Sequence, residues 1–444
     1  MHGRAGENMR LTNNALITPE QKENIRYKVR IRIQQRLKDD YFQFQHEWLK
    51  EIKSNFISFC QDIQSQQLLG NKAEIHYILY SLLRTGLLDH HSAYLIQATD
   101  EHSVFDRNSL EYEYDGHCLY NYWNILIEEL VVEAKNSGWN ISETEMDSVR
   151  LEEAEYFHYA MIPLLRKAVR QAVQLPEYTN LLRASQVEIR AGEYLDQSIC
   201  IYKEDRNELD QIAIHQWISE KTPHTYGYQN IHDITLSWIE AMHQDFRYTT
   251  FQRVQVELSR LDFSILTGTQ WQDCKIQKSA LLFSLLHGAD FSGCTLQYVV
   301  MDGVMGASGI EELDWEPLGY DGVDFSSSQF LQCWLRESKL QGASFRSSCM
   351  DQVDFSKASL RGADFSESNL SNTVFQDADL RDACFDHSQL SGISFAGANL
   401  QGASFAGAML ENTDFTGALL SIEQLDRQQR RDAYGINITG GRLQ

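Results

Sequence analysis

A period of five residues in the C-terminal half is the strongest constraint that this sequence places on its fold. From Phe325 to Leu420, every fifth residue is large and apolar, which makes 20 positions without an exception. In a chain with 43% hydrophobic residues, chance agreement of this kind is on the order of one in ten million. Five matches neither the helical period of 3.6 nor the strand period of 2. The chain must therefore turn at short, regular intervals and direct one large residue inward from each straight piece.

A longer period of 20 residues is superimposed on the period of five. Phenylalanine recurs at this longer spacing, at Phe325, Phe345, Phe365, Phe385 and Phe405. Most positions two residues before a large residue hold a small one, so each straight piece also has a small inward side chain. Coils of four five-residue segments would stack like residues on like, with backbone hydrogen bonds between coils roughly 4.8 Å apart. A strict alternation of ten residues would look the same, so the coil length stays open.

Upstream, the same rule holds in a different phase, from Leu261 to Met301. The small positions there include Cys274 and Cys294, and Cys333 occupies one in the second stretch, so we expect these cysteines in the core. The distance from Met301 to Phe325 is 24 residues, which breaks the period. We therefore predict a β-helix in two parts, residues 249–301 and 323–420, separated by an acidic insertion at 302–322.

Several segments of this stretch resemble the pentapeptide-repeat family, whose motif is A(D/N)LXX. They are ADFSG at 289–293, ADFSE at 363–367, ADLRD at 378–382 and ANLQG at 398–402. The resemblance covers residues 251–420 and implies a right-handed quadrilateral β-helix. It implies little about function, because the family is diverse. Six aspartates stand just before inward residues, where we expect them to hydrogen-bond the corner turns: Asp290, Asp324, Asp354, Asp364, Asp379 and Asp414.

The last segment, residues 421–444, predicts a short helix over 421–433 with Ser421 as its N-cap, followed by a short strand. One interpretation is a plain cap, because the last coil of a β-helix otherwise offers an open edge. The segment also resembles the C-terminal module of Qnr-type quinolone-resistance proteins, which joins two β-helices tail to tail. This resemblance implies a homodimer with Tyr434, Ile436 and Ile438 at the contact.

The N-terminal half predicts an α-helical domain of unknown type over residues 19–248, after a disordered or expression-derived start at 1–18. Apolar residues recur three or four apart in its first segment, and further helices are expected near 73–98, 118–136, 145–173 and 207–220. The basic stretch 22–38 could bind phosphate, but Glu23 and the acidic remainder of the chain favour a solvated face. The predicted fold is therefore multidomain: an N-terminal all-α domain, then an all-β right-handed quadrilateral β-helix with a helix–strand cap.

The sequence offers little that indicates catalysis. It contains no P-loop, no Rossmann GxGxxG and no GxSxG elbow. Two ExxH pairs, Glu155–His158 and Glu240–His243, would each share a helical face, but chance placement yields about one, so two is near chance. We therefore predict no catalytic, cofactor-binding or metal-binding residues, and no cofactor.

Charge and cysteine usage limit the partners and the compartment. The net charge of −23 repels nucleic acid, so direct nucleic-acid binding is not expected. No run approaches the ~20 apolar residues of a membrane helix, and the start lacks the apolar core of a signal peptide. Eight scattered cysteines without a CxxC pair indicate a reduced, cytoplasmic protein that binds no membrane.

These observations favour a non-enzymatic interaction protein that presents an acidic β-helical rod to a protein partner. One mechanism is DNA mimicry, for which the resemblance to Qnr-type proteins implies DNA gyrase or topoisomerase IV as the partner. A second hypothesis is a scaffold or adaptor in a bacterial peptide-modification or effector pathway, whose helical half holds a pathway enzyme or peptide. A third is an enzyme with its site in the N-terminal half.

The acidic insertion is the predicted contact site for a partner, because loops carry function when a rigid scaffold positions them. It contains Trp315, a residue type enriched at binding hot spots. Acidic side chains surround this tryptophan, and the candidate contact residues are Glu311, Glu312, Asp314, Trp315 and Glu316. The alternative is a surface insertion without function, which a solenoid tolerates at little cost.

Overall fold

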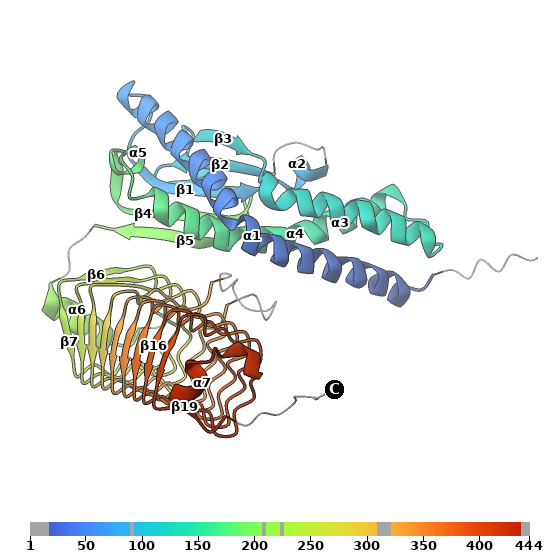
Figure 1. Ribbon diagram of the computed structural model, residues 1–444. Coiled ribbons are helices and arrows are strands. Elements are labelled where there is room, and N and C mark those ends of the chain that lie inside the picture. The colour runs from blue at the N-terminus through green and yellow to red at the C-terminus, as the bar shows by residue number, and fades with distance from the viewer. Residues whose placement is uncertain (1–16, 89–92, 207–209, 223–225, 309–320, 437–444) are drawn as a thin grey trace, which may run out of the picture. The chain divides into compact units, whose positions relative to one another are not determined.

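The structure is a computed structural model that describes residues 17–88, 93–206, 210–222, 226–308 and 321–436. The chain divides into two compact units. The first comprises Met1–Ala184 with Ile189–Ile201, and the second comprises Ser185–Glu188 with Tyr202–Gln444. Figure 1 shows helices and a small sheet in the first unit and a stack of coils in the second.

Three long helices dominate the first unit: α1 (Pro19–Leu68), α3 (His117–Asn136) and α4 (Glu143–Ala172). Thr18 caps α1 in a capping box with Gln21, and proline follows at the first helical position, so the helix begins where its sequence signals place it. α1 packs against both α3 and α4 (Figure 1). The shorter helices of this unit are α2 (Arg84–Leu88), η1 (Ser103–Phe105) and α5 (Pro176–Thr179).

A five-stranded sheet accompanies these helices, with the strand order β3-β2-β1-β4-β5. β1 pairs antiparallel with β2, and β2 pairs antiparallel with β3. Side chains on one face meet the helices, because Tyr94 contacts His158 of α4 and Tyr112 contacts Phe59 of α1. The strands are β1 (Ile75–Leu82), β2 (Tyr94–Thr99), β3 (Leu110–Tyr114), β4 (Arg183–Glu193) and β5 (Ser198–Asp205).

The N-terminal region is helical as predicted, and it also contains this sheet, which the description all-α leaves out. The helix predicted near 73–98 is wrong, because β1 and β2 occupy half of that range and, among its described residues, only the short α2 is helical. Their sequence explains the error: IHYILYSL is almost continuously apolar, and periodicity cannot separate such a run from a buried helix. Its aromatic and β-branched residues favour a strand.

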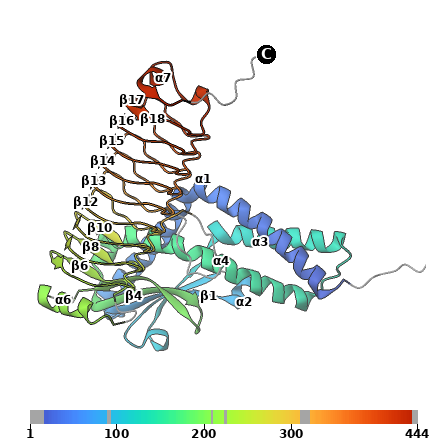
Figure 2. The ribbon, with the colours of Figure 1, turned by 90° about the horizontal axis from the view of Figure 1, so that it is seen from below.

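The second unit is a four-sided β-helix with 20 residues in most coils. Its largest sheet has nine parallel strands, β7, β9, β11 to β17. Their paired residues are 20 apart, as in Gln389↔Met409, except between β12 and β13, where they are 34 apart. This spacing confirms coils of four segments and excludes the alternation of ten. A second face carries the three-stranded sheet of β6, β8 and β10, and single parallel bridges stack on the other faces. Figure 2 shows the labelled strands rising in sequence order.

Each strand of the β-helix is only two or three residues long. The first sheet consists of β7 (Thr235–Ser237), β9 (Gln255–Glu257), β11 (Lys275–Gln277), β12 (Thr295–Gln297), β13 (Gln329–Leu331), β14 (Cys349–Asp351), β15 (Asn369–Ser371), β16 (Gln389–Ser391) and β17 (Met409–Glu411). The second consists of β6 (Asn230–His232), β8 (Thr250–Gln252) and β10 (Gln270–Gln272). Such short strands are stable here because neighbouring coils pair with one another.

The core is a column of stacked side chains, as the period of five predicts. Phe365 stacks on Phe385 with ring centroids 5.0 Å apart, and Phe385 stacks on Phe405 at 5.1 Å. The predicted burial of Cys274, Cys294 and Cys333 is confirmed. Burial raises the pKa of Cys294 to about 12 and that of the other two thiols to about 11, so all three are protonated at neutral pH.

The β-helix begins one coil earlier than predicted, inside the range that the sequence assigned to the helical domain. β6 and β7 pair with β8 and β9 and thereby form a first coil. Ile231, Leu236 and Phe246 fill its large inward positions. Ala241 stands at the fourth, and this small residue interrupts the pattern of large ones that marks the later coils.

The insertion is also narrower than predicted. Bridges across it join residues 34 apart instead of 20, as in Asp290↔Asp324, so the insertion adds 14 residues. The segment before Ser308 still belongs to a coil, because Met305 bridges Leu285 and Lys339. Val323 donates a backbone hydrogen bond of 2.9 Å to the carbonyl of Gly306, so the insertion leaves and re-enters the coil at one place.

Both ends of the β-helix are capped by segments of its own unit. At the start, Ile214 and Ile218 of α6 (Gln211–Ser219) are buried in the same apolar cluster as the coils. At the end, η2 (Ile422–Gln424), α7 (Gln429–Asp432) and β19 (Ala433–Tyr434) follow the last coil, and β19 pairs with β18 (Thr413–Asp414). The single helix predicted over 421–433 is therefore wrong. The strand predicted after it begins at β19, and residues 437–444 lie outside the described part of the chain.

Candidate functional site

The outer surface of the β-helix is built from corner turns that follow each inward residue. At most corners the last turn residue has a positive φ, as at Glu367 and His387. All six aspartates named from the sequence accept a hydrogen bond from the backbone N–H of the residue two positions later. These acceptors are Asp290, Asp324, Asp354, Asp364, Asp379 and Asp414. Their predicted role in the corner turns is therefore confirmed, and these carboxylates are structural parts of the coils.

Ion pairs between and within coils neutralise much of the remaining acidity. Residues 323–420 hold 12 acidic and 6 basic residues. Five of the six cations are paired with carboxylates, in Arg336–Asp302, Arg346–Glu367, Lys357–Glu337, Arg361–Asp382 and Arg381–Asp379. Such exposed pairs contribute little to stability. Their consequence is a surface of mixed charge instead of a bare array of carboxylates.

The five predicted partner-contact residues lie outside the described part of the chain. They are Glu311, Glu312, Asp314, Trp315 and Glu316, and all fall within 309–320. The structure fixes the two ends of the segment that carries them, at Ser308 and Asp321. Asp302, counted with the insertion from the sequence, instead pairs with Arg336 on the next coil.

The C-terminal cap satisfies backbone groups that the last coil would otherwise leave open. The side-chain amide of Gln424 donates to the carbonyls of Leu400 and Ala403, both at 2.7 Å. Gln429 does the same for two further carbonyls, those of Phe405 and Ala408. Of the predicted dimer residues, Tyr434 is 56% exposed, Ile436 packs against the core of its own chain, and Ile438 lies outside the described residues.

In the first unit, the basic stretch of α1 is engaged by acidic residues of α3 and α4. Lys22 pairs with Glu145 at 2.8 Å, and Arg30 pairs at 2.6 Å with Glu153, which is only 2% exposed. Arg26 and Arg32 make further pairs with the same two helices. The expected solvated face is therefore wrong for Arg26 and Arg30, whose side chains are 14% and 24% exposed, whereas the side chain of Arg32 is 53% exposed.

Neither ExxH pair forms a site. His158 is buried, and its Nδ1 lies 2.8 Å from the Tyr94 hydroxyl in a hydrogen bond, whereas Glu155 is exposed. Burial lowers the pKa of His158 to about 4, so this imidazole is neutral at physiological pH. Glu240 and His243 lie on a coil of the β-helix, where they share no helical face. Within the described ranges, no group of three or more potential metal ligands occurs.

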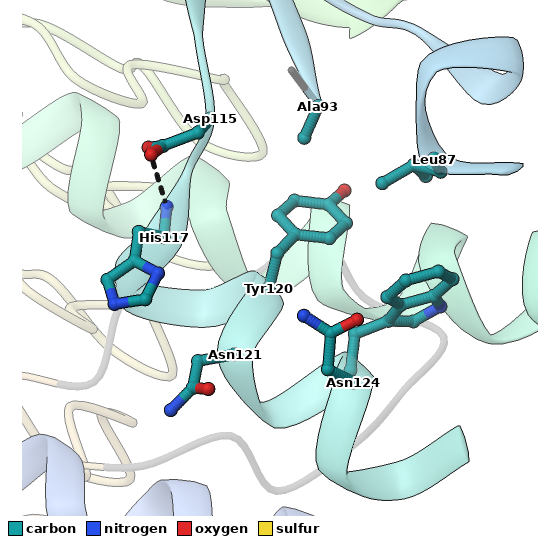
Figure 3. A pocket seen from close by; sticks show the side chains of 8 residues that line it. Leu87, Ala93, Asp115, His117, Tyr120, Asn121 and Asn124 are labelled. Carbon is teal, nitrogen blue, oxygen red and sulfur yellow. Dashed lines mark hydrogen bonds between the residues drawn. The ribbon is translucent and has the colours of Figure 1, made fainter. Parts of the chain in front are cut away.

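One cavity of about 170 Å³ lies in the first unit (Figure 3). Asp115 accepts a hydrogen bond from the backbone N–H of His117, and this contact fixes the start of α3 beside the cavity. The lining combines polar and apolar side chains, namely Leu87, Ala93, Asp115, His117, Tyr120, Asn121, Trp123 and Asn124. Its volume is below the roughly 300–1,000 Å³ of common ligand sites. Sequence reasoning missed it, because its residues come from separate elements and form no motif.

None of the helices described by the structure is long and apolar enough to cross a membrane.

Solved structures similar to this chain include other β-helices. HetL, a pentapeptide repeat protein involved in heterocyst differentiation regulation from the cyanobacterium Nostoc sp. strain PCC 7120, is 16% identical; the match covers 48% of this chain and 98% of HetL, with a TM-score of 0.25. Rfr23 from the cyanobacterium Cyanothece 51142 is 25% identical over 31% of this chain and 88% of its own, with a TM-score of 0.19. QnrB1, a plasmid-mediated fluoroquinolone resistance protein, is 18% identical over 44% of this chain and 92% of its own, with a TM-score of 0.21.

The family comparison agrees with the geometry of the coils. No curated protein matches the chain. The family model described as "Pentapeptide repeats" matches residues 321–356, 358–395 and 383–421, with 8 copies of the repeat. Its bounds enclose the inward phenylalanines from Phe325 to Phe415 and five of the six aspartate-capped corners, whereas the Asp290 corner lies before them. The C-terminal region of this chain therefore consists of pentapeptide repeats folded as a β-helix.

Proposed function

We propose that this protein is a non-enzymatic interaction protein whose β-helix serves as a rigid binding surface. The contrast between inward and outward positions carries the proposal. In three successive coils the inward residue is always phenylalanine (Phe365, Phe385, Phe405), whereas the exposed corner two residues later changes from Glu367 to His387 to Gly407. The scaffold is thus held constant while the chemistry of its surface varies, which suits recognition of a partner.

Rigidity supports the same proposal. The stacked core and the two caps fix the outer side chains before any partner arrives. A preorganised surface loses little conformational entropy on binding, so more of its contact energy appears as affinity. Cross-linking of the full-length protein in its native host, followed by mass spectrometry, tests this role. Cross-links that map to the β-helix support it, and cross-links confined to the first unit contradict it.

DNA mimicry directed at DNA gyrase or topoisomerase IV is the narrower form of this proposal. The described coils support it only partly. The 12 acidic and 6 basic residues of 323–420 leave a net charge of −6 over about five coils. With coils roughly 4.8 Å apart, this is about one charge per 4 Å, against one per ~1.7 Å in double-stranded DNA. A supercoiling assay with purified gyrase decides: inhibition that weakens with salt supports mimicry, and no inhibition removes it.

The adaptor alternative draws on the separate first unit, which is compact by itself and has its own core. In this form, the first unit holds a pathway enzyme or peptide while the β-helix contacts a second protein. If this protein and its purified partner retain a client peptide and have no effect on DNA supercoiling, the adaptor role is distinguished from mimicry. An enzyme in the first unit would have the cavity beside Tyr120 as its available site (Figure 3).

We further propose that the insertion contacts the partner, through Glu311, Glu312, Asp314, Trp315 and Glu316. Its two ends are anchored in the coil by the Val323–Gly306 hydrogen bond, so the scaffold positions it. Replacing 309–320 by a short Gly-Ser linker should abolish partner capture and leave the melting temperature nearly unchanged. Residues 305–307 stay in place, because they belong to the coil. Undiminished capture would move the contact to the faces of the β-helix or to the first unit.

A tail-to-tail homodimer is the remaining proposal. Its contact would combine Tyr434, Ile436 and Ile438 with the end of the nine-stranded sheet, where β17 is the last strand. Met409 of β17 is 63% exposed at this end.

A further inference from the structure

The first coils of the β-helix expose aromatic residues at two adjacent corners. Trp238 and Tyr298 belong to one corner column, and Phe263 and Phe283 to the next. Their exposed fractions are 75% for Trp238, 41% for Tyr298, 46% for Phe263 and 51% for Phe283. Clusters of exposed apolar residues on this scale mark interaction sites more often than single ones do.

Stacking orders the rings of the second column. His243 lies on Phe263 with centroids 5.0 Å apart, and Phe263 lies on Phe283 at 5.3 Å, both nearly parallel. The column ends where Phe283 covers Gly303, because a Cβ at Gly303 would lie only 2.3 Å from the ring. The stacked faces are thus occupied, and the ring edges point outward.

These aromatic side chains sit in a backbone conformation that disfavours them. The φ angle is 60° at Trp238, 56° at Phe263, 53° at Phe283 and 58° at Tyr298, in the left-handed region. The same two columns continue in later coils mainly with glycine and polar residues, as at Gly392 and Gly397. The corner turn therefore does not require aromatic residues, and their recurrence in the first coils is a property of this part of the surface.

Between the two columns, three successive coils place apolar residues on the connecting face. Ala280, Val300 and Trp334 follow one another along it through parallel bridges, Arg260 precedes them, and the Arg336–Asp302 ion pair flanks them. We define the aromatic face by six residues of these columns and this face: Phe263, Phe283, Tyr298, Ala280, Val300 and Trp334.

One cation beside the aromatic face is left without a carboxylate. Lys278 is exposed at the corner immediately before Tyr298 in its column, and within the described part of the chain it makes no ion pair. Arg253 and Arg260 of the neighbouring coils are neutralised by Asp233 and Asp262. On a chain with a net charge of −23, an unpaired lysine beside apolar rings favours an acidic partner segment.

We propose that the aromatic face binds an amphipathic α-helix of a partner protein, with acidic residues directed at Lys278. The spacing supports a helix, because rings 5.0 and 5.3 Å apart match the pitch of about 5.4 Å per helical turn. Apolar side chains at i, i+4 and i+7 can then meet successive coils. This inference names the surface and the partner chemistry, and it rests on the proposed interaction role.

Two synthetic peptides of about 18 residues test it, since shorter helices are marginal in water. Both carry leucine at i, i+4, i+7 and i+11 in an alanine-rich host, one with flanking glutamate and the other with flanking lysine. Fluorescence anisotropy with the full-length protein should show binding of the acidic peptide and about tenfold weaker binding of the basic one. Lys278→Glu should reverse this preference.

The decisive variant is Phe263→Asn with Phe283→Asn, which should weaken the acidic peptide about tenfold. Asparagine tolerates the left-handed region, so the melting temperature should not fall. His387→Asn is the matched control, because His387 has φ 59° and lies over Gly407 just as Phe283 lies over Gly303. It should leave peptide binding unchanged.

Other outcomes overturn the inference. If the acidic peptide does not bind at concentrations up to about 1 mM, or binds the double variant as tightly as the wild type, the aromatic face is not a helix-binding site. If the wild-type protein self-associates and the double variant does not, the aromatic face contacts a second copy of the chain. If the protein binds phosphatidylcholine vesicles through this face, it contacts a membrane surface. If the unsubstituted protein forms its native cross-links on the β-helix but does not bind the acidic peptide, this inference fails while the interaction role stands.

Discussion

Phe385 shows how strongly a single inward residue supports the β-helix. It is fully buried between Phe365 and Phe405, with centroid distances of 5.0 and 5.1 Å. Phe385→Ala should cost about 3–5 kcal/mol, because the neighbouring rings cannot close the cavity. Asn369→Ala, at an exposed position of β15, should cost under about 0.5 kcal/mol. Denaturant unfolding compares the two, and equal losses would contradict the inward register.

Asp386 follows Phe385 directly, yet it is not a neutral surface position. Its carboxylate accepts from the backbone N–H of Ala406 at 2.9 Å and from the Ser404 hydroxyl on the next coil. Asp386→Ala should therefore cost about 0.5–1.5 kcal/mol, between the core and surface values. Sequence alone places this residue outside the core and cannot show that it bonds across coils.

His158 makes the stability of the first unit depend on pH. Its pKa is lowered by burial from 6.5 to about 4, so the unfolded chain binds one more proton between these values. Stability is therefore fully present above about pH 6.5 and falls as the pH drops toward 4, by about 3 kcal/mol at most. His158→Gln should flatten this dependence in the same window. If the free energy of unfolding changes with pH equally in the wild-type protein and in His158→Gln, the assignment to His158 is contradicted.

At the scale of elements, the capping glutamines explain how the last coil is closed. Gln424 and Gln429 each donate to two carbonyls that would otherwise face the next coil. Gln429→Ala should cost about 1–3 kcal/mol, because it leaves these buried acceptors unpaired. Hydrogen exchange should then become faster in the last coil. Gln401→Ala, an exposed glutamine of the same coil, serves as the control and should leave exchange unchanged.

An element could be predicted from the sequence where its pattern is contained in a short stretch of the chain. The stacked core was predictable, because each inward residue repeats the same pattern within five positions of its neighbour. The first coil was not predicted because the small Ala241 interrupts the pattern of large inward residues. β1 was not predicted because a continuous apolar run fits a buried helix as well as a strand. The ion pairs between α1 and α4 join residues more than 100 positions apart, as in Arg30–Glu153, so no local pattern reports them.

At the scale of the whole molecule, the placement of exposed apolar side chains separates the ends of the β-helix from its middle. Large apolar residues are exposed in the first coils, at Trp238 and Phe283, and again at the last coil, at Met409 and Leu419. The described coils between them expose glycine, polar and charged corners instead. The acidity of this unit can be read from the sequence, and the tail contact stays a prediction. The aromatic face could not be predicted, because the sequence alone does not show which corner residues of successive coils lie side by side.

The tail contact is best tested without removing the tail. Deleting 421–444 would also remove the glutamines that cap the last coil, so a monomeric product could reflect a damaged end. Met409→Asp combined with Tyr434→Asp instead places charge on the exposed end and leaves the cap intact. Because a two-fold contact repeats each change on both partners, light scattering should show the mass halved at micromolar concentration. Asn369→Asp, in β15 of the same sheet, should remain dimeric. A wild-type protein that is already monomeric, or a double variant that stays dimeric, would contradict a contact at this end.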